Sequence, residues 1–226
     1  MLAIPRHGSF PWLAAILALA FAVPAARAAP AAAAKTPTPS ETSEPLEIHD
    51  TGANLQRAFG GEVNAHHRYL EAAKVAESEG RRDVAALFRA CATAEQAHAD
   101  RHVEAIAWTS GGEARAMMAR LSLGTTLENL QLAAALEDYE VQSLYPALLE
   151  RARAEGHTEA VRSFNFALSA EREHARLLRS ALDRWDAGAG PAAFHVCPKC
   201  GKTVVDVTFP KCPNCFTSAR RFVRVS

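Results

Sequence analysis

The sequence predicts an all-α protein, a four-helix bundle with a small C-terminal metal module. Two observations lead to this fold class. Between about Asp50 and Trp185, apolar residues recur at alternating steps of three and four, the period of amphipathic helices. Near the C-terminus, two Cys-x-x-Cys pairs offer four thiolates to one metal ion. We therefore divide the chain into a signal peptide, a flexible linker, the bundle and the metal module, at residues 1–28, 29–49, 50–190 and 191–226.

The first 28 residues have the features of a secretory signal. A weakly basic start with Arg6 precedes an apolar run from Trp12 to Val23, and an Ala-Arg-Ala motif ends at Ala28. The run is shorter than the about 20 residues that a membrane-spanning helix needs, so we expect no stable membrane span after cleavage. The predicted location is the periplasm, and an uncleaved membrane anchor is the alternative.

The composition argues against a strongly charged protein. The full chain has 25 Lys+Arg and 25 Asp+Glu, and loss of residues 1–28 removes only Arg6 and Arg27, which leaves 23 basic against 25 acidic residues. This balance favours no nucleic-acid partner. Residues 29–49 are rich in Ala, Pro and Thr, cannot bury a core, and are expected to form a flexible linker.

Four helices are expected, and glycines mark most of their ends. The apolar pattern places them at about residues 55–76, 84–105, 127–148 and 161–182, with Gly80, Gly156 and Gly188 beyond the first, third and fourth. Short turns join the helices of each half into antiparallel hairpins, and a longer connection, Thr109 to Gly124, joins the halves. Two helical hairpins linked by one long crossover form the ferritin-like topology.

The two hairpins carry the same pattern of possible metal ligands. Glu-x-x-His occurs in the second and fourth helices, and another Glu precedes it by 33 or 34 residues. The four Glu fall on apolar helix faces, where an unpaired carboxylate costs of the order of several kcal/mol, so metal cations are expected to compensate them. Solvated Glu residues paired with Arg are the alternative. The pattern is the ligand set of a dimetal site in a four-helix bundle: Glu62, Glu95, His98, Glu137, Glu171 and His174.

In these stretches the chain resembles the rubrerythrin family, whose members combine a ferritin-like diiron bundle with a rubredoxin-like module. The resemblance covers roughly residues 50–226 and is carried by Phe59-Gly-Gly-Glu62, Ala94-Glu95-Gln-Ala-His98, Glu137-Asp-Tyr-Glu140, Tyr145-Pro146 and Ala170-Glu171-Arg-Glu-His174. It implies a further ligand, Glu140, which exchanges with His98 at one iron when the oxidation state changes. Ala65 stands at the matching place of the first hairpin, so Glu140 breaks the internal symmetry.

The resemblance also implies catalytic roles beside the ligands and a homodimer. Tyr69 and Tyr145 match family tyrosines near the diiron pocket, where a phenol can hydrogen-bond a carboxylate or bound peroxide. Glu140 and Tyr69 would assist proton movement. The remaining histidines on the apolar faces, His66 and His102, match no family ligand, and we expect them to support the ligands or to be satisfied core residues.

The C-terminal module is expected to fold around one metal ion. Two Cys-x-x-Cys knuckles predict a tetrahedral site, and so short a segment needs the metal to supply its folding free energy. Four thiolates accept Fe, which would transfer electrons, or Zn, which would be structural; disulfides are a further alternative in an oxidising compartment. The module is basic, so we expect it to dock on the acidic bundle of a second subunit. The predicted ligands are Cys197, Cys200, Cys212 and Cys215.

The resemblance implies a non-haem diiron peroxidase, an oxidoreductase that reduces hydrogen peroxide to water in defence against oxidative stress. Its cofactors would be two Fe ions in the bundle and one Fe (or Zn) in the four-Cys site, through which an electron donor of unknown identity would restore the reduced state. A ferroxidase or iron-handling protein is the first alternative, and a non-enzymatic metal-binding protein with a structural zinc ribbon is the second. Glu140 favours the peroxidase, because neither alternative has an evident need for it.

Overall fold

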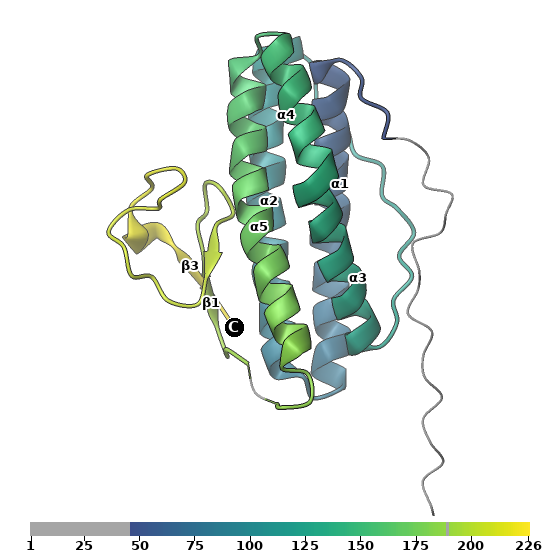
Figure 1. Ribbon diagram of the computed structural model, residues 1–226, viewed down its shortest axis with the longest axis vertical. Coiled ribbons are helices and arrows are strands. Elements are labelled where there is room, and N and C mark those ends of the chain that lie inside the picture. Colours follow the sequence, from purple (N-terminus) through teal and green to yellow (C-terminus); the bar gives the residue numbers. More distant parts are fainter. Residues whose placement is uncertain (1–45, 189) are drawn as a thin grey trace, which may run out of the picture. The chain divides into compact units, whose positions relative to one another are not determined.

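Figure 1 shows the computed structural model, in which residues 46–188 and 190–226 are described. The predicted signal peptide and most of the predicted linker lie outside the described residues. All described residues belong to one compact unit. No helix within them has both the length and the apolar character of a membrane-spanning segment.

The first hairpin consists of α1 (Thr51–Ser78) and α2 (Arg82–Ser110), which pack along each other. The Asp50 side chain caps α1 by accepting a hydrogen bond of 2.8 Å from the Ala53 backbone N–H. The turn between the two helices contains Gly80, whose positive φ of 77° allows the tight reversal. This hairpin brings the faces that carry Glu62 and Glu95 together.

The second hairpin differs from the expected pair of continuous helices. In place of one helix over residues 127–148, the chain forms α3 (Thr126–Tyr139), a π-helical segment η1 (Glu140–Leu144) and α4 (Tyr145–Ala154), before α5 (Thr158–Asp183). A capping box between Thr125 and Glu128 starts α3. Pro146 in the first turn of α4 lacks the N–H that an uninterrupted α-helix would use, which is compatible with a widened turn just before it.

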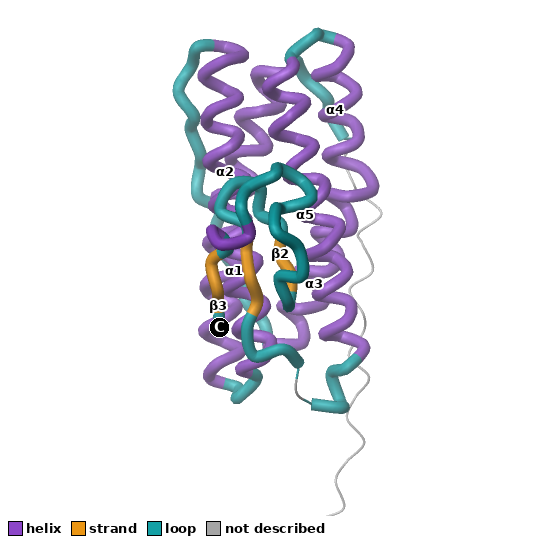
Figure 2. The backbone as a smooth tube through the Cα atoms, turned by 90° about the vertical axis from the view of Figure 1, so that its left-hand side faces the viewer, coloured by secondary structure: helices purple, strands orange, loops and turns teal. Residues whose placement is uncertain are grey.

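The C-terminal module is a three-stranded antiparallel sheet of β1 (Phe194–Val196), β2 (Thr203–Val204) and β3 (Val223–Val225), in the order β2-β1-β3, with a short 3-10 turn η2 (Ala219–Arg221). Figures 1 and 2 show this sheet lying beside α2 and α5 of the same chain. Phe194 and Val196 belong to the same buried apolar cluster as Leu87 of α2 and Leu178 of α5. The module therefore shares the core of the bundle.

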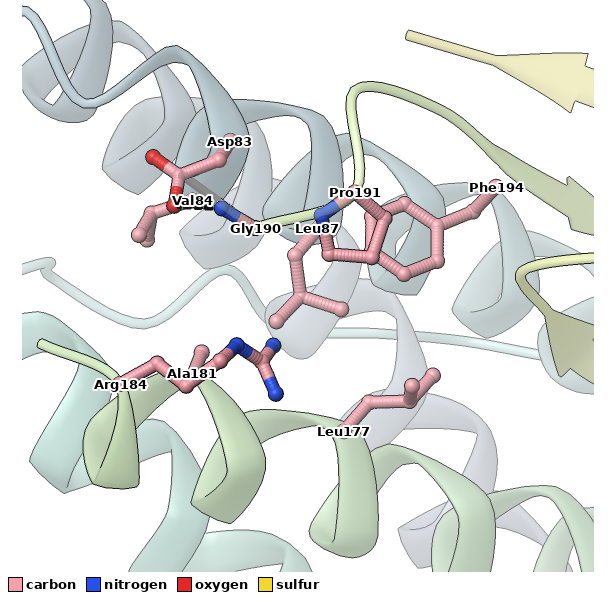
Figure 3. Close-up of a pocket in the computed structure, with 9 residues that line it drawn as sticks. All are labelled: Asp83, Val84, Leu87, Leu177, Ala181, Arg184, Gly190, Pro191 and Phe194. Carbon is pink, nitrogen blue, oxygen red and sulfur yellow. Dashed lines mark hydrogen bonds between the residues drawn. The ribbon is translucent and has the colours of Figure 1, made fainter. Parts of the chain in front are cut away.

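The segment that enters the module is fixed to the start of α2. The Gly190 backbone N–H donates a hydrogen bond of 2.9 Å to the Asp83 carboxylate, and a small pocket beside this bond is lined by Leu87, Leu177 and Phe194 (Figure 3). At the other end of the module, the Arg89 guanidinium donates a hydrogen bond of 2.9 Å to the Ser226 main chain. Both ends of the module are thus hydrogen-bonded to α2.

Candidate metal centres

Every long helix of the bundle contributes to one buried cluster of carboxylates and imidazoles. Two ligand groups can be drawn in it, each with its donor atoms within 4.8 Å of one another. Glu95 and Glu171 belong to both groups, which is the arrangement expected of carboxylates that bridge two metal ions. The first group adds Glu62 and His98, and the second adds Glu137 and His174.

The cluster leaves buried polar atoms without hydrogen-bond partners. Within the described residues these include Oε2 of Glu62, Oε2 of Glu137 and both carboxylate oxygens of Glu171. Nδ1 of His174 also lacks a hydrogen-bond partner, although it lies 2.7 Å from Oε2 of Glu171. Buried polar atoms are normally satisfied, so this set of inward-facing donors fits two cations of iron size and chemistry.

In the metal-free protein the positive and negative charges of the cluster balance. Burial, followed by the neighbouring Glu95 and Glu171, raises the pKa of Glu62 well above its ordinary value; burial and the same two carboxylates likewise raise the pKa of Glu137. Burial opposes charge on Glu95 and Glu171 too, but the adjacent imidazoles lower the pKa of both. Those carboxylates in turn raise the pKa of His98 and His174 against the effect of burial. Two imidazolium ions thus balance two carboxylates, and two carboxylic acids stay neutral.

Metal binding should therefore release protons. Two Fe(II) ions carry four positive charges, which match four ionised carboxylates when the two carboxylic acids and the two imidazolium ions have given up their protons. We expect loading of the bundle at pH 7 to release about four protons per chain and the affinity for Fe(II) to rise with pH. Indicator-dye titration in weak buffer measures the release, and a value near zero would contradict this charge assignment.

The predicted tyrosines each approach a different ligand. The Tyr69 hydroxyl donates to Oε1 of Glu137, and the Tyr145 hydroxyl donates to Oε1 of Glu62. Each bond leaves the Oε2 atom of the same carboxylate free to bind a metal. Glu140 lies at the start of the π-helical segment, is half-buried, and is not a member of either ligand group in this structure, whereas His98 is. Burial and then the nearby carboxylates raise the pKa of Glu140.

The four cysteines of the module also converge. Their Sγ atoms lie within 4.8 Å of one another, with 3.5 Å between Cys197 and Cys215 and 3.6 Å between Cys200 and Cys212. Disulfide sulfurs are about 2.05 Å apart, whereas thiolates about 2.3 Å from a shared metal are separated by about 3.8 Å. All five cysteines of the chain are free. A hydrogen bond from Cys200, with backbone N–H groups of Lys199 and Cys200, lowers the pKa of Cys197 to about 5, which favours the thiolate.

The module meets the bundle at the two histidines. The Thr203 hydroxyl donates to the Gly201 carbonyl at 3.0 Å and lies 3.1 Å from Nε2 of His174, from which it accepts. This bond assigns the Nε2 proton and leaves Nδ1 to face the metal cluster. Gly201 packs so closely on Nε2 of His98 that an added Cβ would overlap the ring. Sequence reasoning identified neither contact, because nothing in the knuckle sequence says which surface the knuckle covers.

Docking of the module on a second subunit stays a prediction, because the structure holds one chain. The module covers its own α2 and α5, and it does so through the apolar side chains of β1 and the small residues Gly201 and Thr203. Its basic side chains form no ion pair with an acidic residue of the described parts of the chain. Apolar packing, and not the charge contrast on which the expectation rested, makes this contact.

The fold and these donor sets define a ferritin-like diiron protein with a four-cysteine metal module. The Rubrerythrin family model matches residues 53–182. Rubrerythrin-2 of Clostridium acetobutylicum is 34% identical over 173 residues, covering 74% of this chain and 92% of that protein, and nigerythrin of Nitratidesulfovibrio vulgaris is 36% identical over 169 residues, covering 75% and 83%. This chain belongs to the rubrerythrin family.

Solved structures agree with this assignment. Nigerythrin in its fully reduced, all-ferrous state superimposes with a TM-score of 0.73 at 34% identity, over 81% of this chain and 91% of that one. Bacterioferritin BfrA of Mycobacterium tuberculosis matches with a TM-score of 0.56 at 22% identity, over 62% of this chain and 89% of that one, which shows the fold alone. The predicted fold class, family and iron cofactors are confirmed.

Proposed function

We propose that this protein is a non-haem diiron peroxidase that reduces hydrogen peroxide to water and regains its electrons through the four-cysteine iron. The observation that carries the proposal is the direct contact between the two centres. Thr203 hydrogen-bonds the candidate ligand His174, and Gly201, next to Cys200, packs on His98. The residue that follows Cys200 therefore contacts a candidate ligand of the diiron site, which offers electrons a short path from the module to the bundle.

The reaction consumes two electrons and two protons for each peroxide. When bound, the iron pair supplies the two electrons, one from each Fe(II), and H₂O₂ with two protons becomes two molecules of water. Glu62, Glu95, His98, Glu137, Glu171 and His174 would hold the pair, with Glu140 available as a further carboxylate. Tyr69 and Tyr145 orient two of these carboxylates and keep hydroxyl groups beside the pocket.

Glu140 is the proton carrier in this proposal. In the metal-free protein, burial and then the neighbouring carboxylates raise the pKa of Glu140. Its place at the start of η1, one turn after the candidate ligand Glu137, would let it carry a proton to the pocket. After anaerobic reduction and iron loading, stopped-flow mixing with hydrogen peroxide should oxidise the diiron site rapidly, and the Glu140→Ala variant should react about 100-fold more slowly. Glu150→Ala, an exposed residue of α4, is the matched control and should react as the unaltered protein does.

The same experiment separates the alternatives. A thiolate-to-Fe(III) absorption band that rises after the diiron site has been oxidised supports the internal relay. Slow reaction with peroxide but fast reaction of added Fe(II) with dioxygen would indicate a ferroxidase. Zn in the four-cysteine site, with no peroxide reaction, would indicate a metal-binding protein with a structural ribbon.

We also propose that the protein acts outside the cytoplasm. The proposal is supported by the basic start, apolar run and Ala-Arg-Ala motif of the first 28 residues. The mass of the protein isolated from a periplasmic fraction should correspond to a chain that begins at Ala29. A cytoplasmic protein that retains Arg6 would contradict export.

A further inference from the structure

Behind Tyr145 lies a buried histidine that neither ligand group uses. His102 stands on α2 one turn after His98 and is 0% exposed. Its Nδ1 lies 2.8 Å from Oγ of Ser163, and its Nε2 lies 3.1 Å from the Tyr145 hydroxyl. Because Tyr145 donates to Oε1 of Glu62, four side chains form one continuous buried chain of hydrogen bonds that ends on a candidate metal ligand.

The Glu62 end of this series of hydrogen bonds determines which group donates in each bond. A metal-bound Glu62 is a carboxylate and can only accept, so Tyr145 must give it the single hydroxyl proton. The Tyr145 oxygen is then an acceptor for Nε2–H of His102. A neutral imidazole with its proton on Nε2 has a lone pair on Nδ1, and the Ser163 hydroxyl donates to it. When the metal is present, this is the only assignment of donors and acceptors that forms all three hydrogen bonds.

Internal symmetry shows that packing does not require a histidine here. His98 and His174 are equivalent residues of the two hairpins, and the residue four places after His174 is Leu178. Leu178 is fully buried in the same apolar cluster as Tyr69, the counterpart of Tyr145. Among the described residues, the Tyr145 hydroxyl therefore has a hydrogen bond to His102 besides the one to Glu62, whereas the Tyr69 hydroxyl has only the one to Glu137.

The surroundings of His102 keep it uncharged. Burial, followed by the neighbouring His98, lowers its pKa to about 3. Phe164 and Tyr145 pack on its ring, with centroid distances of 5.5 Å and 6.2 Å. Burying an imidazole in such a place is costly unless both nitrogens are hydrogen-bonded, and both are.

We propose that His102 is a positioning residue of the metal site. As its Nε2–H tautomer, which accepts at Nδ1 from Ser163, it donates to Tyr145 and holds the phenol in the orientation that donates to Oε1 of Glu62, which leaves Oε2 as the metal-binding oxygen. Glu62 is thereby held as a one-oxygen ligand. Glu137 is freer to turn, because its partner Tyr69 receives no hydrogen bond from a side chain of the described residues. The inference rests on the metal ligation proposed above and not on peroxidase activity.

The tautomer of His102 can be observed directly. In Zn(II)-loaded, ¹⁵N-histidine-labelled protein, the His102 signals, identified by their loss in His102→Gln, should show the proton on Nε2. Ser163→Ala removes the donor to Nδ1 but leaves the metal-bound Glu62 and Tyr145 in place, so the proton should stay on Nε2. A proton on Nδ1 in the unaltered, Zn(II)-loaded protein would overturn the proposal, because Tyr145 would then have to donate to His102 and not to Glu62.

Metal affinity gives a second readout that does not depend on turnover. His102→Leu restores the symmetry with Leu178 and should weaken Fe(II) binding by about 3- to 10-fold, less than the 10- to 100-fold typical of direct partners of a ligand. His102→Gln can place an amide N–H near the position of Nε2 and should recover most of the affinity. In a Tyr145→Phe background, His102→Leu should have no further effect. Equal losses for Leu and Gln, or additive losses with Tyr145→Phe, would show that the ring only fills space.

Discussion

Replacing Glu171 by Ala should abolish iron binding by the bundle and leave the four-cysteine centre loaded. Glu171 is fully buried, and its two oxygens lie 2.8 Å from Nδ1 of His98 and 2.7 Å from Nδ1 of His174. It belongs to both ligand groups, so its loss removes a donor from each metal position. We expect Fe(II) affinity to fall by more than about 100-fold, because even the loss of a residue that only hydrogen-bonds a ligand costs about 10- to 100-fold.

The metal-free Glu171→Ala protein should also be less stable. The variant leaves the two imidazoles with one buried carboxylate in place of two, and removing one partner of a buried charge pair costs about 3–5 kcal/mol. Metal analysis should find about one iron per chain in place of about three, and thermal unfolding of the metal-free form should occur at a lower temperature. Glu173→Ala removes a partly exposed carboxylate from the same helix and should change neither quantity. Full iron content in Glu171→Ala would exclude a bridging role.

Replacing Cys200 by Ser should unfold the module and disconnect the diiron site from its electron supply. Cys200 is fully buried, and the module is too small to fold without its metal. The bundle should still bind iron and react once with peroxide, but re-reduction by an external donor should slow by more than about 100-fold. Cys91→Ala removes the remaining, buried thiol of α2 and should leave both centres loaded. Unchanged re-reduction in Cys200→Ser would mean that electrons bypass the module.

A second variant distinguishes loss of the metal from loss of contact. In Gly201→Ala the four cysteines remain, but the new Cβ meets the ring of His98, and the backbone φ of 71° is unfavourable for alanine. The module should keep its iron and its absorption spectrum, while the transfer of electrons to the diiron site slows. Normal transfer in Gly201→Ala would show that the close packing on His98 is not required.

The metal centres were the part of the molecule most accessible to sequence reasoning. Glu95 with His98, and Glu171 with His174, lie on one helix face because of their three-residue spacing, so the pattern forces their convergence once the helices form. The cysteines of each Cys-x-x-Cys knuckle are also close in sequence, so their convergence on one metal could be predicted in the same way. The break in the third helix was missed, since Glu140 fits the helical period as well as any neighbour, and only the folded chain reveals the π-helical turn.

The sequence by itself determined the fold class, the family and the two sets of candidate ligands, because periodicity and short spacing place those residues on common faces. The tertiary structure decided what lies against them. It set the module on its own bundle, placed Gly201 and Thr203 on the two histidines, and paired the Tyr145 hydroxyl with His102. Such contacts join residues up to about a hundred positions apart, and they depend on how whole surfaces pack, which no local pattern encodes.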